Sequence, residues 1–205
     1  MAAYSDVKAV TITADTVALD ADGISVAASV GNNAALTIGG ALASGGAVAL
    51  SHGRIVTILS AGNDAAKSFT VTGTDVNGDA QTESITGANA GTATGTKFFK
   101  TISGISAVGN PAGNVSAGVN ASAADAIFAG RSRLKGVYLT STATAGTTDF
   151  LTTSPSGTSI MGLSSVGDAD ATRDVVIPEA GVVFSDGIYI EYTVSTFLTM
   201  TVFHA

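Results

Sequence analysis

The chain has 205 residues; Ala, Thr, Gly and Ser make up just over half of them, and only 12% of the residues are charged. It contains no Cys, which excludes disulfides, thiolate metal sites and cysteine nucleophiles. Nine basic and sixteen acidic side chains give a net charge of −7, which argues against a protein that follows nucleic-acid phosphates with a basic surface.

The composition is that of a folded chain without a membrane segment. Hydrophobic residues make up 45% of it, too many for disorder, and the length allows one or two domains. The opening MAAYSDVKAV lacks the basic region and apolar run of a targeting segment. The longest uncharged stretch lies between Asp22 and Arg54, and its seven Gly exclude a membrane helix. We expect no membrane and no nucleic acid among the partners.

The first 13 residues are expected to form an N-terminal arm, followed by a β-sandwich domain over residues 14–120. In that domain Ser68–Thr72 reads SFTVT, and this alternation of apolar and polar residues predicts a strand with one buried face. Asn77-Gly78 separates two alternating runs, which predicts a hairpin, because both residues tolerate the positive φ of a tight turn.

Residues 121–130 are expected to link two domains. They offer the best helix signal in the chain, over Ser122–Ala129. Ser122 can cap a helix of about two turns, Asp125 stands three residues further on, and Gly130 can end it.

A second β-sandwich domain is expected over residues 131–205. Apolar residues alternate with polar ones along Ile188–Val194 and again along Leu198–Val202. Short strands separated by Gly, Asn and Pro are typical of sandwiches and barrels. The sequence therefore predicts an all-β protein with two antiparallel β-sandwich or jelly-roll-like domains in tandem.

Groups that could carry out catalysis are few. His52 and His204 are the only histidines, and no G-x-S-x-G elbow accompanies them. We interpret His52 as a loop residue and His204 as a frayed or packed chain end. Glu83 and Glu191 lie in alternating strands, where an outward carboxylate is ordinary. We expect no catalytic residue and no enzyme.

Two acidic segments resemble parts of cation sites. Residues 75–79, DVNGD, look like the start of a calcium loop, but Thr86 stands where that loop needs a bidentate Glu, and a hairpin turn explains the same residues. Asp168, Asp170 and Asp174 could hold a cation, and a solvated loop explains them as well. We expect no metal and no cofactor.

The basic residues cluster once, at Arg131, Arg133 and Lys135. Three positive charges in an acidic chain can dock an acidic patch of a partner. They can equally keep an edge strand soluble. These three residues are the candidate partner contacts, with both interpretations open.

Gly53–Gly118 contains an S-A-G-N-D turn, an F-T-V-T-G-T-D strand with its N-G hairpin, a T-E-S-I-T-G strand, an N-A-G-T loop and a K-F-F-K-T strand. These features resemble a module in structural proteins of tailed bacteriophages, marine ones especially. The C-terminal region is similar in layout to another small phage module, with its K-G-V-Y opening, T-A-G turn and T-V-F ending. Neither resemblance brings a catalytic residue.

The resemblance implies a virion protein made in the host cytoplasm. Size, acidity and two β domains favour a capsid decoration (cement) protein, a homo-oligomer and most of all a homotrimer, that stabilises the shell by contacts with the major capsid protein or other virion proteins. One alternative is a tail, neck or fibre-base component of the virion. A second is a carbohydrate-binding module for adhesion to the host.

Overall fold

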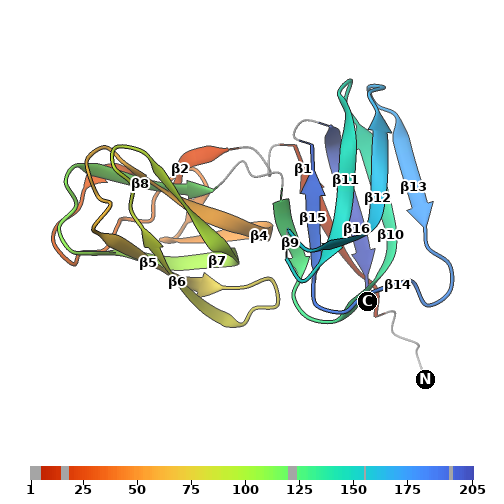
Figure 1. Cartoon of the computed structure of the whole chain (residues 1–205), viewed down its shortest axis with the longest axis horizontal. Coiled ribbons are helices and arrows are strands. Elements are labelled where there is room, and N and C mark those ends of the chain that lie inside the picture. The colour runs from red at the N-terminus through yellow and green to blue at the C-terminus, as the bar shows by residue number, and fades with distance from the viewer. Residues whose placement is uncertain (1–5, 15–18, 120–123, 155, 194–195) are drawn as a thin grey trace. The chain divides into compact units, whose positions relative to one another are not determined.

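The protein consists of β-strands in both of its parts (Figure 1). The computed structural model describes residues 6–14, 19–119, 124–154, 156–193 and 196–205. These residues form sixteen strands, β1 to β16, so the predicted all-β sandwich class is confirmed. Among them there is no helix that could cross a membrane.

The chain divides into two compact units that do not simply follow one another in the sequence. One, the inserted unit, spans Ala18–Ser122. The other, the split unit, combines Met1–Val17 with Ala123–Ala205. Each unit has a hydrophobic core of its own. The boundary therefore differs from the expected one, because the second domain includes residues that precede the first.

The inserted unit is built from seven antiparallel strands. They are β2 (Asp20–Ser29), β3 (Ala43–Ser44), β4 (Ala47–Ser60), β5 (Ser68–Thr74), β6 (Ala80–Thr86), β7 (Thr92–Val108) and β8 (Asn114–Val119). They pair in the order β2-β8-β4-β7-β5-β6, with β3 beside the start of β4. The long strand β7 pairs mainly with β4 along its first half and with β5 along its second half.

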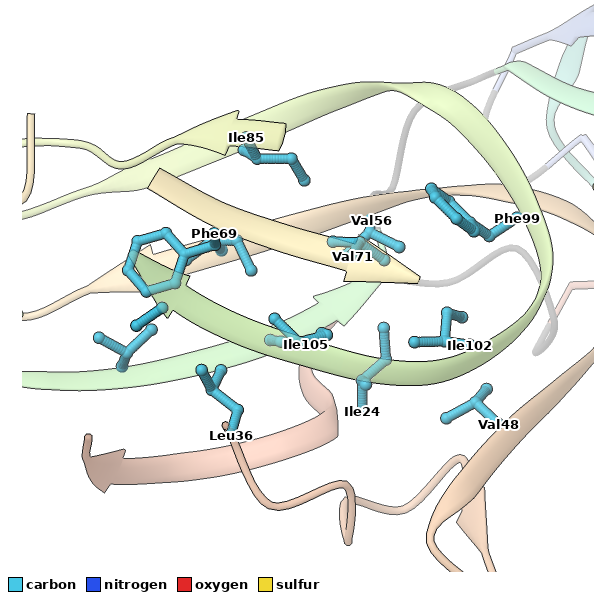
Figure 2. Packing of buried hydrophobic residues seen from close by; sticks show 14 of the residues in the cluster. Ile24, Leu36, Val48, Val56, Phe69, Val71, Ile85, Phe99, Ile102 and Ile105 are labelled. Atoms are coloured by element: carbon cyan, nitrogen blue, oxygen red, sulfur yellow. The ribbon is translucent and has the colours of Figure 1, made fainter. Parts of the chain in front are cut away.

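The alternation in the sequence places one face of these strands in a core. Phe69 and Val71 of β5 are both 0% exposed, as the alternation of SFTVT predicts. Figure 2 shows them in one cluster with residues from other strands, among them Phe99 and Ile105 of β7. Each buried side chain of this size contributes about 1.5–3 kcal/mol to the free energy of unfolding. This cluster is therefore the main stabilising feature of the unit.

The predicted hairpin is confirmed. Strands β5 and β6 pair from Ser68↔Thr86 to Thr74↔Ala80. Gly78 has φ +91° in the turn between them, a conformation that residues with a Cβ rarely adopt.

The split unit is built from nine strands in two sheets. They are β1 (Lys8–Thr13), β9 (Ala124–Phe128), β10 (Ser132–Ser141), β11 (Ala145–Thr152), β12 (Thr158–Val166), β13 (Thr172–Val176), β14 (Val182–Phe184), β15 (Ile188–Tyr192) and β16 (Phe197–His204). One sheet has the order β1-β16-β10-β13, with β14 also on β10, and the other has the order β12-β11-β15-β9. Between them lies a core that includes Phe150, Phe184 and Met200, all 0% exposed.

The strand pairs of the split unit nest inside one another. β1 pairs with β16, β9 with β15, β10 with β13 and β14, and β11 with β12, all antiparallel. This nesting arises when one long hairpin rolls up into two facing sheets, which is the connectivity of a jelly roll. The inserted unit occupies the connection between the first two strands of that roll.

The expected N-terminal arm is wrong for residues 8–13. They form β1, which pairs with β16 from Lys8↔His204 to Thr13↔Thr199. Ile12 is 0% exposed in the core of the split unit. The pattern is hard to recognise because the strand is short and its partner lies about 190 residues further along the chain.

The expected short helix is also wrong. Ala124–Phe128 is the strand β9, which pairs with β15, while Ser122 lies outside the described residues. Asp125 is 1% exposed and accepts a hydrogen bond of 2.6 Å from the hydroxyl of Tyr192. The Ala-rich segment favours a helix by intrinsic propensity, and its tertiary pairing with β15 overrides that preference.

Candidate functional site

The predicted basic cluster lies at the start of β10. Arg133 Nη1 donates to the carbonyl oxygen of Ala180 at 3.3 Å, and Lys135 Nζ donates to that of Glu179 at 2.7 Å. Both side chains are half-buried, whereas Arg131 is exposed. Two of the three candidate contact residues therefore hold the loop between β13 and β14 of their own unit.

That loop runs close to β10 and has a constrained backbone. Glu179 has φ +55° and Gly181 has φ +77°. A Cβ on Gly181 would lie 2.4 Å from the carbonyl oxygen of Leu134, so only Gly fits at this position. Binding of the loop carbonyls by Arg133 and Lys135 is a structural role. A partner contact stays a prediction, for which Arg131 has the most accessible side chain of the three.

His52 is a residue of a buried strand. It lies in β4, so the expectation of a loop histidine is wrong, and it is 1% exposed. Its Nδ1 is 2.8 Å from the hydroxyl of Ser51, and the carbonyl oxygen of Ser51 accepts a hydrogen bond from Lys100 Nζ. Burial lowers the pKa of Lys100. A general base must reach a proton of the substrate, and a ring with so little exposure is poorly placed to do so.

His204 is packed near the end of β16, in line with the expectation of a packed residue. It is 3% exposed, its ring centroid is 5.1 Å from that of Phe128, and its Nδ1 is 3.4 Å from Ser132 Oγ. Burial lowers the pKa of His204, and the positive charge of Lys8 lowers it further. A hollow of about 400 Å³ beside it is lined by Asp6, Lys8, Phe128, His204 and Ala205.

Glu83 is held by the backbone of β7. Its Oε1 accepts hydrogen bonds from Thr96 N at 2.6 Å and from Thr96 Oγ1 at 2.9 Å, and Lys97 N lies 3.3 Å away. A Cβ on Gly95 would lie 2.6 Å from Glu83 Oε2, so the glycine leaves room for the carboxylate. The carboxylate therefore joins β6 to β7.

The acidic segment at 75–79 forms a turn, whereas the second segment is divided between a loop and strand β13, which contains Asp174. Asp75 Oδ1 accepts hydrogen bonds from Asn77 N at 2.8 Å and Asp79 N at 3.0 Å, which organises the hairpin turn. Asp168 and Asp170 are exposed in the loop before β13. Among the described residues there is no group of three or more His, Cys, Asp and Glu side chains that could hold a metal ion.

The outer face of the β1-β16-β10-β13 sheet carries threonines in register. Thr13, Thr199, Thr140 and Thr172 are successive cross-strand partners, and together they form a row that crosses four strands. We call this the threonine row. In the next row Thr11 Oγ1 lies 3.0 Å from Thr201 Oγ1. This face is broad, hydroxyl-rich and low in charge.

Asp64 is a structural residue whose role was not apparent from its place in the S-A-G-N-D turn. It is 0% exposed, and its Oδ1 accepts a hydrogen bond of 2.7 Å from Ala112 N. Its backbone N donates to Ala88 O at 2.9 Å, and its carbonyl oxygen accepts from Lys67 N at 2.8 Å. One residue therefore joins three loops of the inserted unit, and a lone Asp in a turn gives no signal of such distant partners.

Comparisons of the chain with protein-family models, with characterised proteins and with solved structures find no match. Roles for its residues therefore come from the geometry. His204, Glu83, Asp75 and Asp64 are all engaged in contacts that hold strands or loops.

Proposed function

We propose that the chain is a structural protein of a tailed-bacteriophage virion and that it decorates the capsid. In this role it strengthens the shell through contacts with the major capsid protein. The observation that carries the proposal is the threonine row with its neighbouring hydroxyl-rich positions on the outer face of the sheet, where Thr172 is exposed and the other three threonines are half-buried. The resemblance over Gly53–Gly118 and over the C-terminal region supports the same class of protein.

A face of threonines suits a dry contact between rigid surfaces. Each side chain offers a methyl group and a hydroxyl, and it has little rotamer freedom to lose on binding. A contact that buries about 1,200–2,000 Å² in total is ordinary for a stable complex. Repetition over the capsid lattice raises the avidity when a copy contacts several shell subunits.

Copy number in purified virions tests the proposal. Quantitative gel densitometry is expected to give hundreds of copies per particle for a decoration protein. About six or twelve copies would instead indicate the tail, neck or fibre-base alternative. Absence from the particle, together with binding to a glycan array, would favour the adhesion alternative.

The contact face is tested by paired variants. Thr199→Lys puts a charge in the middle of the threonine row and is expected to reduce binding to undecorated capsids at least about tenfold, because a lysine desolvated without a partner is costly. Thr82→Lys is the matched control, on the exposed face of β6 in the inserted unit. Equal binding by both variants would show that the threonine row is not the contact.

Salt dependence gives a third test. The chain has few charges, and the threonine row has none. Screening by salt weakens contacts between exposed charges and leaves apolar contacts intact. We expect capsid binding to persist in 1 M NaCl. Release of the protein at that salt concentration would contradict a contact made by the threonine row.

A further inference from the structure

Strand β12, Thr158–Val166, is an outer strand without a charged side chain, and its pairing with β11 has one register shift, between Phe150 and Leu151. In the described part of the chain it pairs with β11 alone. None of its nine residues is charged, and the uncharged stretch around it runs from Phe150 to Gly167. Ile160 is 41% exposed and Val166 is 67% exposed. Outer strands present unpaired N–H and C=O groups, and native proteins normally protect such edges with charged side chains.

Four other outer strands carry charged side chains. They carry Lys8 on β1, Arg173 and Asp174 on β13, Asp20 and Asp22 on β2, and Glu83 on β6. The contrast is within one molecule, so the general scarcity of charge in the chain does not explain it. β12 is the outer strand best suited to pair with another strand.

The backbone groups of β12 that face the free edge follow from the pairing of β11. Thr193 N donates to Thr147 O at 2.9 Å, so Thr147 directs its backbone groups to the β15 side. These groups alternate along a strand, so those of Thr148 face β12, where Thr148 lies opposite Leu163. Leu163 therefore turns its N–H and C=O to β11. Gly162 and Ser164, on either side of it, turn theirs to the free edge.

We propose that β12 pairs with β12 of a second copy of this chain, antiparallel and with the two-fold axis at Gly162. Met161 of each copy then lies opposite Leu163 of the other. Both side chains are partly buried and pack against the core of the split unit, so the pairing extends that core from one copy into the next. The contact is the same on both copies, as a two-fold dimer requires.

A second copy fits this edge better than a charged partner does. The two residues of the strand that pack against the core, Met161 and Leu163, lie on either side of Gly162, so a two-fold axis there places each opposite the other. Each copy carries a net charge of −7, which opposes association. Pairing through uncharged strands brings no acidic residue of β12 against its equivalent. The homotrimer expected for a capsid decoration protein would need a different contact. Dimer and trimer differ in mass, so a mass measurement distinguishes them.

Single-cysteine variants test the register, because the chain has no Cys of its own. The two Gly162 Cα atoms would be about 5.5 Å apart, within the range of a disulfide. Gly162→Cys is expected to form a covalent dimer under mild oxidation. Its Cβ would meet the side-chain carboxylate of Asp149, with Oδ1 at 2.8 Å, and that side chain can turn aside at the cost of its hydrogen bond from Ser159. Val166→Cys is the control, since its two Cα atoms would be about 27 Å apart. Equal cross-linking of both variants would overturn the proposal.

Light scattering tests the contact itself. The wild-type protein is expected to have twice the chain mass of 20.1 kDa. Ser164→Pro removes an N–H from the free edge and is expected to weaken the dimer about tenfold to a hundredfold, because two backbone hydrogen bonds are lost per dimer. Thr172→Pro is the control on β13. Ala171 O accepts from Ser141 N, so the backbone groups of Thr172 face away from β10.

Each outcome decides the question. A dimer that Ser164→Pro dissociates and Thr172→Pro preserves supports the proposal. A wild-type monomer at 100 µM, a trimer, or a dimer that withstands Ser164→Pro overturns it. If Ser164→Pro fails to fold, the pair of cysteine variants gives the answer. A monomer that captures a strand of a capsid protein through this edge would show a different occupant.

Discussion

Several carboxylates of this chain act by accepting backbone N–H groups. Glu83 binds the amides of β7, Asp75 organises a hairpin turn, and Asp64 joins loops that are distant in the sequence. Hydrogen bonds to a charged acceptor are about twice as strong as neutral ones. A protein with so few charged residues therefore uses some of them as internal connectors.

Glu83→Ala is expected to lower the free energy of unfolding by about 1–3 kcal/mol, because the amides of Thr96 and Lys97 lose a charged acceptor. Urea unfolding followed by circular dichroism measures the change. The matched control is Glu191→Ala, at an exposed position of β15 opposite Asp149, where we expect a change within about 0.5 kcal/mol. Equal effects of the two substitutions would contradict the role given to Glu83.

The stability of the split unit is expected to fall as the pH drops below about 6.5, the ordinary pKa of histidine. Burial and the charge of Lys8 lower the pKa of His204 in the folded state, so the unfolded chain takes up this proton first. The neutral ring of His204 makes its full contribution to the free energy of unfolding above pH 6.5. That contribution is lost as the pH falls through the lowered pKa of the folded state.

Tyrosine fluorescence measures this effect selectively, because all four tyrosines belong to the split unit and the chain has no Trp. Denaturant midpoints at pH 7.0 and 5.5 are compared for the wild type and for His204→Gln. The variant is expected to lose part of the pH dependence. An unchanged dependence in the variant would assign it to other groups.

At the scale of elements, local signals predicted local structure. The β5–β6 hairpin could be predicted because alternation and an Asn-Gly turn lie within about 20 residues. Strands β1 and β9 could not be predicted, because the apolar–polar alternation of each is short and the strands that they pair with, β16 and β15, lie far along the chain. The candidate basic cluster was visible in the sequence. The hydrogen bonds from Arg133 and Lys135 to loop carbonyls could not be predicted, because these carbonyls lie 47 and 44 residues further along the chain.

Ile12→Ala tests whether β1 is part of the split unit. Ile12 is 0% exposed, and removing a buried side chain of this kind costs about 2–5 kcal/mol. We expect a loss of that size in unfolding followed by tyrosine fluorescence. Val176→Ala is the control, since Val176 is 76% exposed. An effect no larger than that of the control would support the free arm predicted from the sequence.

At the scale of the whole molecule, the connectivity determines what can be removed. The inserted unit enters the jelly roll by one connection and has its own core. We expect a chain in which a short Gly/Ser linker replaces residues 18–122 to keep a cooperative transition by tyrosine fluorescence. It should also refold faster than the full chain, because closing a shorter loop costs less entropy. Loss of the transition would show that the split unit depends on the inserted one.

The pairing of β1 with β16 has a consequence for synthesis on the ribosome. The first strand of the jelly roll emerges about 190 residues before its partner, β16. At about 5–20 residues per second, roughly 10–40 s pass between the two. Throughout that time the nascent β1 is a strand without its neighbour, while the inserted unit can already fold. A transcript cut short before β16 therefore yields a product with one finished unit and one open sheet, which cellular proteases can recognise and remove.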